Sequence, residues 1–549
     1  MLNKIKSIVQ TKAPLVKLQE SKGIFLFLSF SDGTQRAQVH HFFEMSFEKA
    51  WEKLERCYKE WVQAEKPLNQ WLRVDWAQQV KKTHVAQLEE WLQGVKRNYF
   101  RWGVLFDENL EYAFTEQELN ANAMLYGGVK IPHVVINKTN FNSYARKKYG
   151  HLSTSLDGEQ PIWMLDNAGV FVATDEAPVL LYGKGRDAGR RHIEKLSVHN
   201  VEHLIQTSSH YLATQVQPSG LFYYGWHPCF DREIKFYNTL RHCSTIYSMV
   251  EAWEITRSDE LLQAIQKALE YALQHFVKIE TDSQGIQRAF VVEHTGKEIK
   301  LGANAVLILA LSKYSELIHP TQYLKLLESL ALGIEFMQDP VTGRFSHVLN
   351  YPNLSIKDEF RIIYYDGEAA FGLMRLYGLT KDPRWLRIVE KAFEYFIEKE
   401  HWRAHDHWLS YCVNELTLYK EKEKYYRFGL KNIVGYLDFV ANRITTFPTL
   451  LELMMAAQRM VERLQNSETY RHLLNELDVD EFYSALEKRA HYLLNGYFAP
   501  EIAMYFANPQ RIKGSFFIRH HSFRVRIDDV EHYLSGYVAY LKYLQKKNR

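Results

Sequence analysis

Residues 360–380 read FRIIYYDGEAAFGLMRLYGLT, and residues 401–416 read HWRAHDHWLSYCVNEL. In both stretches a loop rich in aromatic and acidic residues leads into an apolar segment with many small side chains. Asp366 and Glu368 stand at the start of the first apolar segment, and Asp406 and His407 stand at the start of the second. Between them, residues 383–399 have the spacing of an amphipathic surface helix. Such alternation of buried and half-exposed helices is typical of a helical toroid.

The alternation continues from about residue 197 to the end of the chain. One set of segments is amphipathic, and the other is apolar over most of its circumference, as in ANAVLILAL (303–311) and ELMMAAQRM (452–460). A helix that is apolar all round must be buried. We expect twelve helices, at residues 197–215, 234–256, 259–277, 302–318, 321–338, 363–379, 383–399, 408–420, 423–442, 446–464, 480–496 and 528–546. Six of each type predict an inner and an outer ring, which is an (α/α)6 toroid.

The competing architecture is an open α-solenoid of the tetratricopeptide type. Such a solenoid has a fixed repeat of about 34 residues. Here the spacing between successive apolar segments varies from about 40 to 80 residues, and the last loop, residues 498–526, is especially long. Variable loops favour the closed ring.

The first 190 residues mix strands and helices and predict an α+β domain. Ser46 and Thr115 are the expected N-caps of two of its helices. Two apolar runs, at residues 162–165 and 169–173, flank Asp166 and Asn167 and predict a β-hairpin. Strands are expected at 24–30, 36–43, 72–76 and 98–106, and helices at 47–61, 84–95 and 116–125. We therefore divide this mainly α chain into an α+β domain at residues 1–190 and a toroid domain at residues 191–549.

Composition limits the partners of the protein. The net charge of +3 is too small to indicate nucleic-acid binding, and no apolar run is long enough for a membrane span. The N-terminus lacks the apolar core of a signal peptide, so we expect a cytoplasmic protein. Aromatic residues make up 14% of the chain, which fits either core packing or a cleft with aromatic platforms for sugars.

The chain is similar in architecture to the six-hairpin glycosidase-like superfamily. The resemblance covers residues 197–546 and rests on elements such as GLFYYGW (220–226), YYDGEAAFGLMRLYGLTKDPRWL (364–386) and HDHW (405–408). It includes no family-specific catalytic signature. The resemblance implies an (α/α)6 toroid, a ligand held over the end of the inner ring by the connecting loops, and catalysis by carboxylates.

Candidate site residues follow from the ring. The N-terminal ends of the inner helices would open onto one face, where carboxylates transfer protons, aromatic rings stack on sugars and Arg forks bind anions. The acid–base candidates are Asp366, Glu368 and Asp406. The expected substrate-binding residues are Trp226, Tyr237, Arg241, His242, Tyr365, His407, Trp408, Tyr411, Arg524 and Arg526.

Several candidates also have a structural interpretation. Asp366 and Asp406 lie near helix N-termini, where Asp is a favoured cap. Glu368 would suit the helix dipole, although its apolar neighbours favour an inward functional carboxylate. Arg241 and His242 would otherwise be paired interior groups that pin the ring.

Metal binding is not expected from the sequence. His520 and His521 with Asp528 and Asp529 match no standard ligand spacing. A zinc site of the lanthionine-cyclase type needs convergent cysteine and histidine ligands. Cys243 and Cys412 lack the usual adjacent Cys-His pair, and all four cysteines are scattered. The prediction is therefore no metal and no cofactor.

Two functions of different classes remain. The first is a carbohydrate-active enzyme that hydrolyses a glycosidic bond or epimerises a sugar in an acidic or amino-sugar-containing glycan, within bacterial surface-polysaccharide metabolism. The second is a non-catalytic partner in polysaccharide biosynthesis that binds glycan or protein. An enzyme requires carboxylates, or a carboxylate and a tyrosine, to face one another across the funnel.

Overall fold

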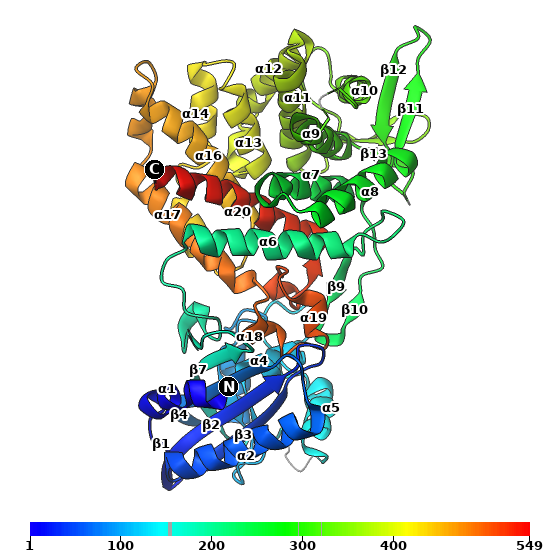
Figure 1. The fold of residues 1–549 in the computed structure, drawn as a ribbon. Helices are drawn as coiled ribbons and strands as arrows, with labels where there is room; N and C mark the ends of the chain where they lie inside the picture. The colour runs from blue at the N-terminus through cyan, green and yellow to red at the C-terminus, as the bar shows by residue number, and fades with distance from the viewer. Residues whose placement is uncertain (152–155, 295, 320, 549) are drawn as a thin grey trace.

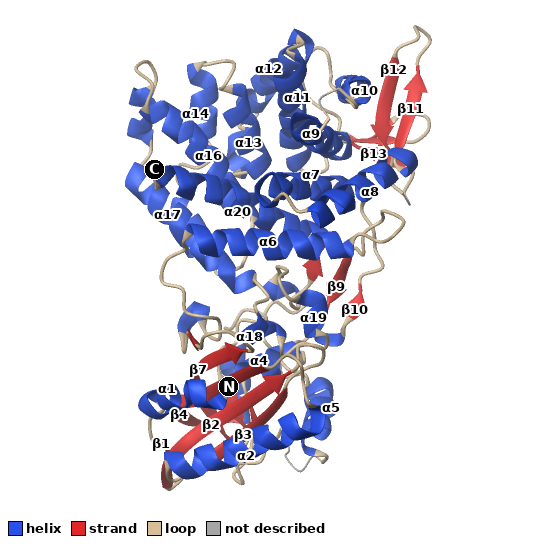
Figure 2. Ribbon diagram, viewed as in Figure 1, coloured by secondary structure: helices blue, strands red, loops and turns tan. Residues whose placement is uncertain are grey.

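A computed structural model describes residues 1–151, 156–294, 296–319 and 321–548. The chain forms an α+β part that contains the N-terminus and a helical body that contains the C-terminus (Figure 1). Strands dominate the first part and helices the second (Figure 2). The predicted fold class, a toroid preceded by an α+β part, is confirmed.

The α+β part is built on an eight-stranded antiparallel sheet. Its order is β1-β2-β4-β7-β5-β6, with β3 added beside β2 and β8 beside β7. The strands are β1 (Val16–Leu18), β2 (Ser21–Ser31), β3 (Gln38–Glu44), β4 (Trp71–His84), β5 (Gly103–Leu105), β6 (Ala113–Phe114), β7 (Pro161–Ala173) and β8 (Val179–Leu181).

Both faces of this sheet are covered. Helices α1 (Leu2–Lys12) and α2 (Phe47–Glu65) pack on one face through a core that includes Trp51 and Trp76. Helices α3 (Val85–Leu92), α4 (Glu116–Ala121) and α5 (Lys138–Tyr149) pack around β5 and β6. Phe25 and Phe27 lie on the opposite face of the sheet, in the core that continues into the helical body. The sheet is therefore a wall on which the body rests.

The N-caps are confirmed, whereas the predicted hairpin is wrong. Ser46 accepts a hydrogen bond from the backbone of Lys49, and Thr115 forms a capping box with Glu118. Residues 161–173 form the single strand β7, and Asp166 and Asn167 lie within it. Its register with β4 shifts at these residues, which oppose Gln79 and Ala77. An irregularity in the ladder absorbs the polar pair without reversing the chain.

Six inner helices form a closed ring. Each contacts the next in the order α7-α9-α11-α13-α16-α20, and α20 returns to contact α7. Their bounds are α7 (Thr239–Thr256), α9 (Leu301–Leu317), α11 (Tyr364–Thr380), α13 (His407–Leu416), α16 (Thr449–Gln465) and α20 (Ile527–Lys547). The contact between the last helix and the first excludes an open solenoid.

The outer helices each pair with an inner helix in a hairpin. They are α6 (Val198–Gln215), α8 (Asp259–His275), α10 (Leu324–Phe336), α12 (Pro383–Glu398), α14 (Glu423–Lys431) and α17 (Val479–Tyr492). α12 buries one stripe and exposes the other side, whereas α9 is buried almost all round. The two sequence patterns thus correspond to the two rings. The predicted helix at 423–442 is divided, because α15 (Leu437–Asn442) is a separate short helix.

Short strands join the helices of the body. A hairpin of β11 (Val277–Thr281) and β12 (Gln287–Val291), which the sequence did not predict, projects beside α10 (Figure 1). Two small sheets lie among the loops, one formed by β9 (Gly225–His227), β10 (Arg232–Glu233) and β16 (Val525–Arg526), the other by β13 (Glu298–Lys300), β14 (Val348–Asn350) and β15 (Ile356–Asp358).

Residues 498–526 connect the sheet to the ring through buried polar contacts. This segment includes the short helices α18 (Pro500–Ala503) and α19 (Pro509–Ile512). Arg73 of β4 pairs with Asp75 and donates to the carbonyl oxygen of Glu501 at 2.9 Å. Tyr505 donates to the hydroxyl of Ser29 at 2.8 Å. The α+β part and the ring share one continuous core, and the domain division at residue 190 stays a prediction.

Across the described residues, none of the helices combines the length and apolar character needed to cross a membrane.

Candidate active site

A cavity of about 320 Å³ lies at the N-terminal ends of the inner helices. Residues far apart in the sequence meet there because the first turns of five inner helices, α7, α11, α13, α16 and α20, contribute to its lining. The lining residues are Asn238, Leu240, Arg241, Ser244, Ile362, Tyr364, Tyr365, Glu368, Trp408, Phe447, Pro448, Thr449, Ile518, His520, His521, Arg524, Arg526, Asp528, Asp529, Glu531 and His532. We call it the N-end cavity. The expected convergence of loops on one mouth is therefore present.

Glu368 of α11 is a buried carboxyl in the wall of the N-end cavity. Its Oε2 has no hydrogen-bond partner among the described residues. The packing makes room for this group, because a Cβ at Gly302 of α9 would lie only 1.9 Å from Oε2. Burial, with the nearby carboxylate of Asp406, raises the pKa of Glu368 to about 8. Glu368 is consequently a protonated acid at neutral pH.

The other two acid–base candidates do not line this cavity. Asp406 is the N-cap of α13 and accepts a hydrogen bond from the backbone of Leu409 at 2.8 Å. Asp366 lies in the first turn of α11, with Oδ2 3.3 Å from His347 Nε2. Both side chains are buried, and the Oδ1 atom of each has no hydrogen-bond partner among the described residues, so their distance from the cavity lining is what separates them from Glu368. Asp406 therefore caps a helix, as its structural interpretation predicted, and Asp366 is held by a neighbouring histidine.

Arginines and aspartates form a compact ionic cluster on one side of the cavity. Arg526 donates to Asp528 at 2.8 Å and to Asp529 at 3.0 Å. Arg524 lies 3.2 Å from Asp529, and Arg241 Nε lies 3.0 Å from Asp528. The three predicted anion-binding arginines thus line the cavity together. The adjacent carboxylates of Asp528 and Asp529 already neutralise part of the positive charge of these arginines.

The two aspartates have different protonation tendencies. Burial and the adjacent Asp529 raise the pKa of Asp528, although Arg241 opposes the shift. Asp529 is also buried, but Arg524 and Arg526 outweigh this penalty and lower its pKa to about 2. Oδ1 of Asp528 has no hydrogen-bond partner among the described residues. Asp528 is thus the member of the pair with a free acceptor at the cavity.

Sequence reasoning missed the next turn of α20. Glu531 lines the cavity and accepts hydrogen bonds from Ser244 at 2.7 Å and Thr245 at 2.9 Å. His532 also lines it and bonds through Nδ1 to Glu452 of α16 at 2.8 Å. The available signal was the run of acidic and histidine side chains in RVRIDDVEHY (524–533), because a helix expected to be buried rarely carries so many charges.

Five predicted binding residues lie outside the cavity lining: Trp226, Tyr237, His242, His407 and Tyr411. Tyr237 and His242 bond to each other at 2.7 Å, and burial lowers the pKa of His242 to about 4. A neutral buried imidazole does not bind an anion by charge. Trp226 donates to Gln215, and Tyr411 donates to Glu452. These side chains support the ring, whereas Tyr365 and Trp408 do line the cavity.

His520 and His521 line the cavity, but among the described residues they do not form a metal-binding group with Asp528 and Asp529. Burial and neighbouring cationic groups lower the pKa of His520 to about 3 and of His521 to about 4. The carboxylates of Asp528 and Asp529 are engaged by arginines instead.

The α+β part holds the wall that carries these histidines. Arg97 donates from Nε to the carbonyl oxygen of His520 at 2.6 Å. Asn98 donates from its side chain to the carbonyl oxygen of Arg519 at 2.7 Å. Asn98 is buried and adopts a left-handed backbone conformation with φ of 64°. The N-terminal part therefore fixes the position of one side of the N-end cavity.

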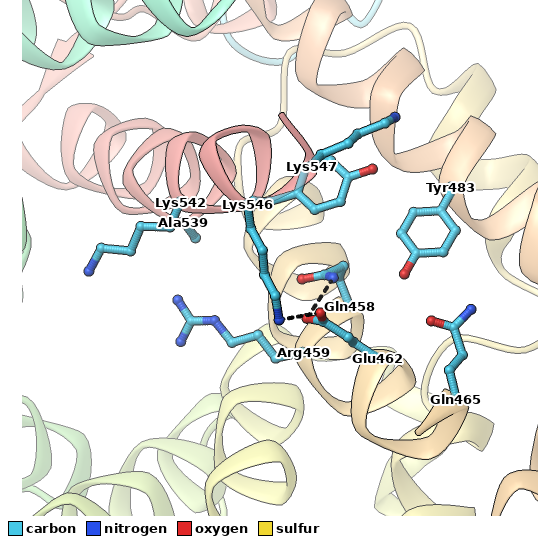
Figure 3. Close-up of a pocket in the computed structure, with 10 residues that line it drawn as sticks. Gln458, Arg459, Glu462, Gln465, Tyr483, Ala539, Lys542, Lys546 and Lys547 are labelled. Atoms are coloured by element: carbon cyan, nitrogen blue, oxygen red, sulfur yellow. Dashed lines mark hydrogen bonds and ion pairs between the residues drawn. The ribbon is translucent and has the colours of Figure 1, made fainter. Parts of the chain in front are cut away.

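A second cavity, of about 630 Å³, lies near the C-terminal ends of α16 and α20 (Figure 3). We call it the C-end cavity. Glu462 pairs there with Lys546 and accepts from Gln458, as the dashed lines in Figure 3 mark. Its other lining residues are Arg459, Gln465, Tyr483, Ala539, Lys542, Tyr543 and Lys547. Although it is larger, it contains no buried carboxyl among the described residues.

No protein-family model matches the sequence, and no curated protein sequence matches it. Solved structures with a related arrangement include a D-mannose isomerase, with a TM-score of 0.48 and 11% identity over 64% of this chain and 100% of that chain. Cellobiose 2-epimerase from Bacillus thermoamylovorans B4167 gives a TM-score of 0.47 and 12% identity over 63% of this chain and 99% of that chain.

An α-1,6-mannanase, GH76A of Salegentibacter sp. HEL1_6, gives a TM-score of 0.42 and 11% identity over 63% of this chain and 99% of that chain. At such identity a structural likeness concerns the fold alone. The closed double ring of helices is observed directly in this chain. The (α/α)6 toroid that the sequence resemblance implied is thereby confirmed.

Proposed function

We propose that the protein is a carbohydrate-active enzyme that uses acid–base chemistry in the N-end cavity, with Glu368 as its proton donor. The observation that carries this proposal is the buried Glu368 carboxyl, whose Oε2 has no partner among the described residues. A structural carboxyl in such a position is normally paired, because an unsatisfied buried polar atom costs free energy. A functional carboxyl is instead left for a substrate to satisfy.

The composition of the cavity supports a sugar as substrate. Tyr365 and Trp408 offer aromatic surfaces beside Glu368. Polar groups converge on the same space from α7, α11 and α20. Apolar rings with a few directed polar groups suit a molecule that has both C–H faces and hydroxyls.

Two reactions use a neutral carboxylic acid in this position. In hydrolysis, Glu368 gives its proton to the glycosidic oxygen, the bond from that oxygen to the anomeric carbon breaks, and water adds to the carbon. In epimerisation, a base removes a proton from the carbon next to a carbonyl group, and an acid returns a proton to the opposite face. Asp528 is our candidate for the base, because it lines the same cavity and one of its oxygens has no hydrogen-bond partner among the described residues.

The arginines support the anionic character of the substrate within this proposal. Arg241, Arg524 and Arg526 line one side, whereas Asp528 and Asp529 supply only two carboxylates. A uronate carboxylate or a phosphate would complete the charge balance through a bidentate contact. An acidic or amino-sugar-containing glycan of bacterial surface-polysaccharide metabolism, handled in the cytoplasm, is the substrate class and setting we infer.

The test separates the two reactions by NMR. The protein is incubated in D₂O with a glucuronate-containing disaccharide, a neutral glucose disaccharide or N-acetylglucosamine. Deuterium entering a C–H position identifies epimerisation, whereas a new reducing end identifies hydrolysis. We expect Glu368→Gln to abolish the signal and Glu462→Gln, in the C-end cavity, to preserve it.

Binding of a probe without turnover in any arm would favour the non-catalytic partner. Equal turnover in wild type and Glu368→Gln would reject Glu368 as the donor. Asp406→Asn is a further comparison, because Asp406 neighbours Glu368 but caps a helix. A loss of thermal stability that exceeds any loss of rate is the expected result for that variant.

A further inference from the structure

Three side chains meet beside the N-end cavity, and one of them, His532, lines it. His407 begins α13, Glu452 lies in the first turn of α16, and His532 lies in the second turn of α20. These helices are consecutive in the inner ring. The ligand atoms of the three residues all lie within 4.8 Å of one another. Two imidazoles and a carboxylate form the donor set of many catalytic zinc sites.

We propose that His407, Glu452 and His532 bind a divalent transition-metal ion of the zinc type. The cluster is not a surface group of acids, because His407 and Glu452 are buried and His532 is largely enclosed. It lies where the ring opens, since His532 lines the N-end cavity. Three protein ligands would leave the remaining coordination position facing that cavity.

A second observation independently indicates a ligand. The Nε2 atom of His407 is buried and has no hydrogen-bond partner among the described residues. The other imidazole nitrogen of His407, Nδ1, lies 3.2 Å from Asp406 Oδ1. The rings of His407 and His532 are 5.3 Å apart between centroids and nearly perpendicular. An imidazole with a carboxylate beside one nitrogen and the other nitrogen without a partner is an arrangement that suits a metal ligand.

The other two residues are supported in the same way. Glu452 accepts a hydrogen bond from Tyr411 at 3.3 Å through Oε1, while Oε2 is the atom that contacts His532. His532 has Nδ1 against Glu452 and Nε2 3.7 Å from Glu531. Each proposed ligand therefore has a polar neighbour outside the cluster, namely Asp406 for His407, Tyr411 for Glu452 and Glu531 for His532. Such outer groups orient the ligands of bound metals.

The site explains two features that the proton chemistry of Glu368 does not use. One is the charged turn at the start of α20, where Glu531 and His532 lie on a buried helix of the inner ring. The other is Glu452, a buried acid at the start of the mostly apolar ELMMAAQRM segment. Metal binding itself is independent of the proposed reaction. Only the role of the open position, as a contact for a substrate oxygen, rests on the proposed function.

The experiment measures binding rather than activity. The full-length protein is freed of metal with a chelator and titrated by calorimetry with Zn²⁺, and in parallel with Co²⁺ and Mn²⁺. We expect one high-affinity Zn²⁺ site per chain in the wild type. His407→Ala and Glu452→Gln should each weaken it by at least about 100-fold, while Asp406→Asn should weaken it by about 10–100-fold.

The matched control is His347→Ala, because His347 is another buried histidine at ion-pair distance from an aspartate, Asp366. Its Zn²⁺ affinity should equal that of the wild type. X-ray absorption on the loaded protein should give two imidazole nitrogens and one carboxylate oxygen at about 2.0–2.2 Å. Circular dichroism checks that each variant is folded. If a variant of a proposed ligand fails to fold, Asp406→Asn still tests the site.

Absence of Zn²⁺, Co²⁺ and Mn²⁺ binding to the wild type would overturn the proposal. Binding with equal affinity in the wild type, Glu452→Gln and Asp406→Asn would do the same, because the ion would then sit elsewhere. Metal binding that is lost in these variants would support the site even if no sugar probe were turned over.

Discussion

The two ends of the ring differ in how far their charged side chains are exposed to solvent. In the C-end cavity the Lys546 side chain is 71% exposed and forms a direct, solvent-exposed ion pair with Glu462 (Figure 3). In the N-end cavity Glu368 is only 3% exposed, and its pKa is raised to about 8. The C-end cavity has about twice the volume, 630 Å³ against 320 Å³. Enclosure, rather than volume, is what gives side chains unusual acid–base properties.

Helix direction contributes to the same difference. The N-terminal ends of five of the six inner helices contribute to the lining of the smaller cavity, and the partial positive charge of a helix N-terminus favours carboxylates there. Lys542, Lys546 and Lys547 lie near the C-terminus of α20, where cations are favoured. The basic residues of the C-end cavity are thus explained by the helix itself, whereas the unpartnered acid of the N-end cavity is not.

The largest expected effect tests this contrast directly. Glu368→Gln should lower the turnover number by about 10²–10⁴-fold, the range for loss of a general acid. Glu462→Gln makes the same chemical change at the other end and should leave turnover within about twofold. Steady-state kinetics on the sugar probe that the wild type turns over measures both. Similar rates for the two variants would remove the functional distinction between the cavities.

Removal of a buried cation comes next. Arg526→Met should lower the free energy of unfolding by about 3 kcal/mol, because Asp528 and Asp529 lose a shared partner inside the protein. Urea unfolding followed by circular dichroism measures the change. Arg427→Met, which breaks an exposed pair with Glu423, is the control and should cost less than about 1 kcal/mol. Equal losses would mean that burial does not distinguish these ion pairs.

The wall held by the α+β part should also be sensitive. Asn98→Ala removes the side-chain donor to the carbonyl oxygen of Arg519, which keeps only backbone donors, and places alanine in a left-handed conformation. We expect a loss of about 1–3 kcal/mol in stability, and KM should rise more than kcat falls because His520 and His521 shift. Asn442→Ala, which removes an exposed hydrogen bond to Asp438, is the control. An unchanged KM in Asn98→Ala would separate the N-terminal part from the site.

The pH dependence follows from the raised pKa of Glu368. The groups that face it are Asp406 from α13 and Glu531 and His532 from α20. Folded Glu368 holds a proton that an unfolded glutamic acid releases near its ordinary pKa, about 4.3. Its stabilising contribution is therefore complete below that value and is lost as the pH rises through about 8.

The rate of the wild type should fall about tenfold for each pH unit above 8, because the ionised form cannot donate. Glu368→Gln should flatten both the residual rate profile and the corresponding part of the stability profile. Rate measurements and thermal unfolding from pH 5 to about 9 provide the comparison. A wild-type rate that does not change through pH 8 would contradict a protonated donor.

The smallest effect is expected at the C-end cavity. Lys546→Met breaks its exposed pair with Glu462 and should change stability by less than about 1 kcal/mol. The remaining effect should disappear at high salt because exposed charges are screened. Thermal unfolding at low and high ionic strength measures it. A salt-independent loss of several kcal/mol would show that this pair is more enclosed than the contrast assumes.

Much of the architecture follows from the sequence. The apolar circumference of ANAVLILAL and the one-sided pattern of residues 383–399 distinguish inner from outer helices, because burial on all sides excludes charge. Local capping chemistry at Ser46 and Thr115 also predicts where helices begin. In contrast, Asp166 and Asn167 have turn propensity, yet pairing of β7 with β4 keeps them in one strand. Neighbouring strands override local preference there.

The site was predicted only in outline. The sequence placed Glu368, Tyr365, Trp408 and three arginines at one mouth because all belong to the starts of inner helices. It could not separate Glu368 from Asp366, two residues earlier, since their orientation depends on the neighbours α9 and α13. It also missed Glu452 and His532, which are 80 residues apart in the chain and joined by a hydrogen bond.

The sequence by itself determined the number of helices in each ring and the end of the ring at which acids and aromatic residues gather. These properties depend on periodicity and on helix starts, which are local. Only the tertiary structure decided which carboxyls with an unpartnered oxygen line the cavity, which arginines are already neutralised, and which two histidines face each other. Those outcomes depend on desolvation and on distances between side chains from different helices, and both are set when the ring closes.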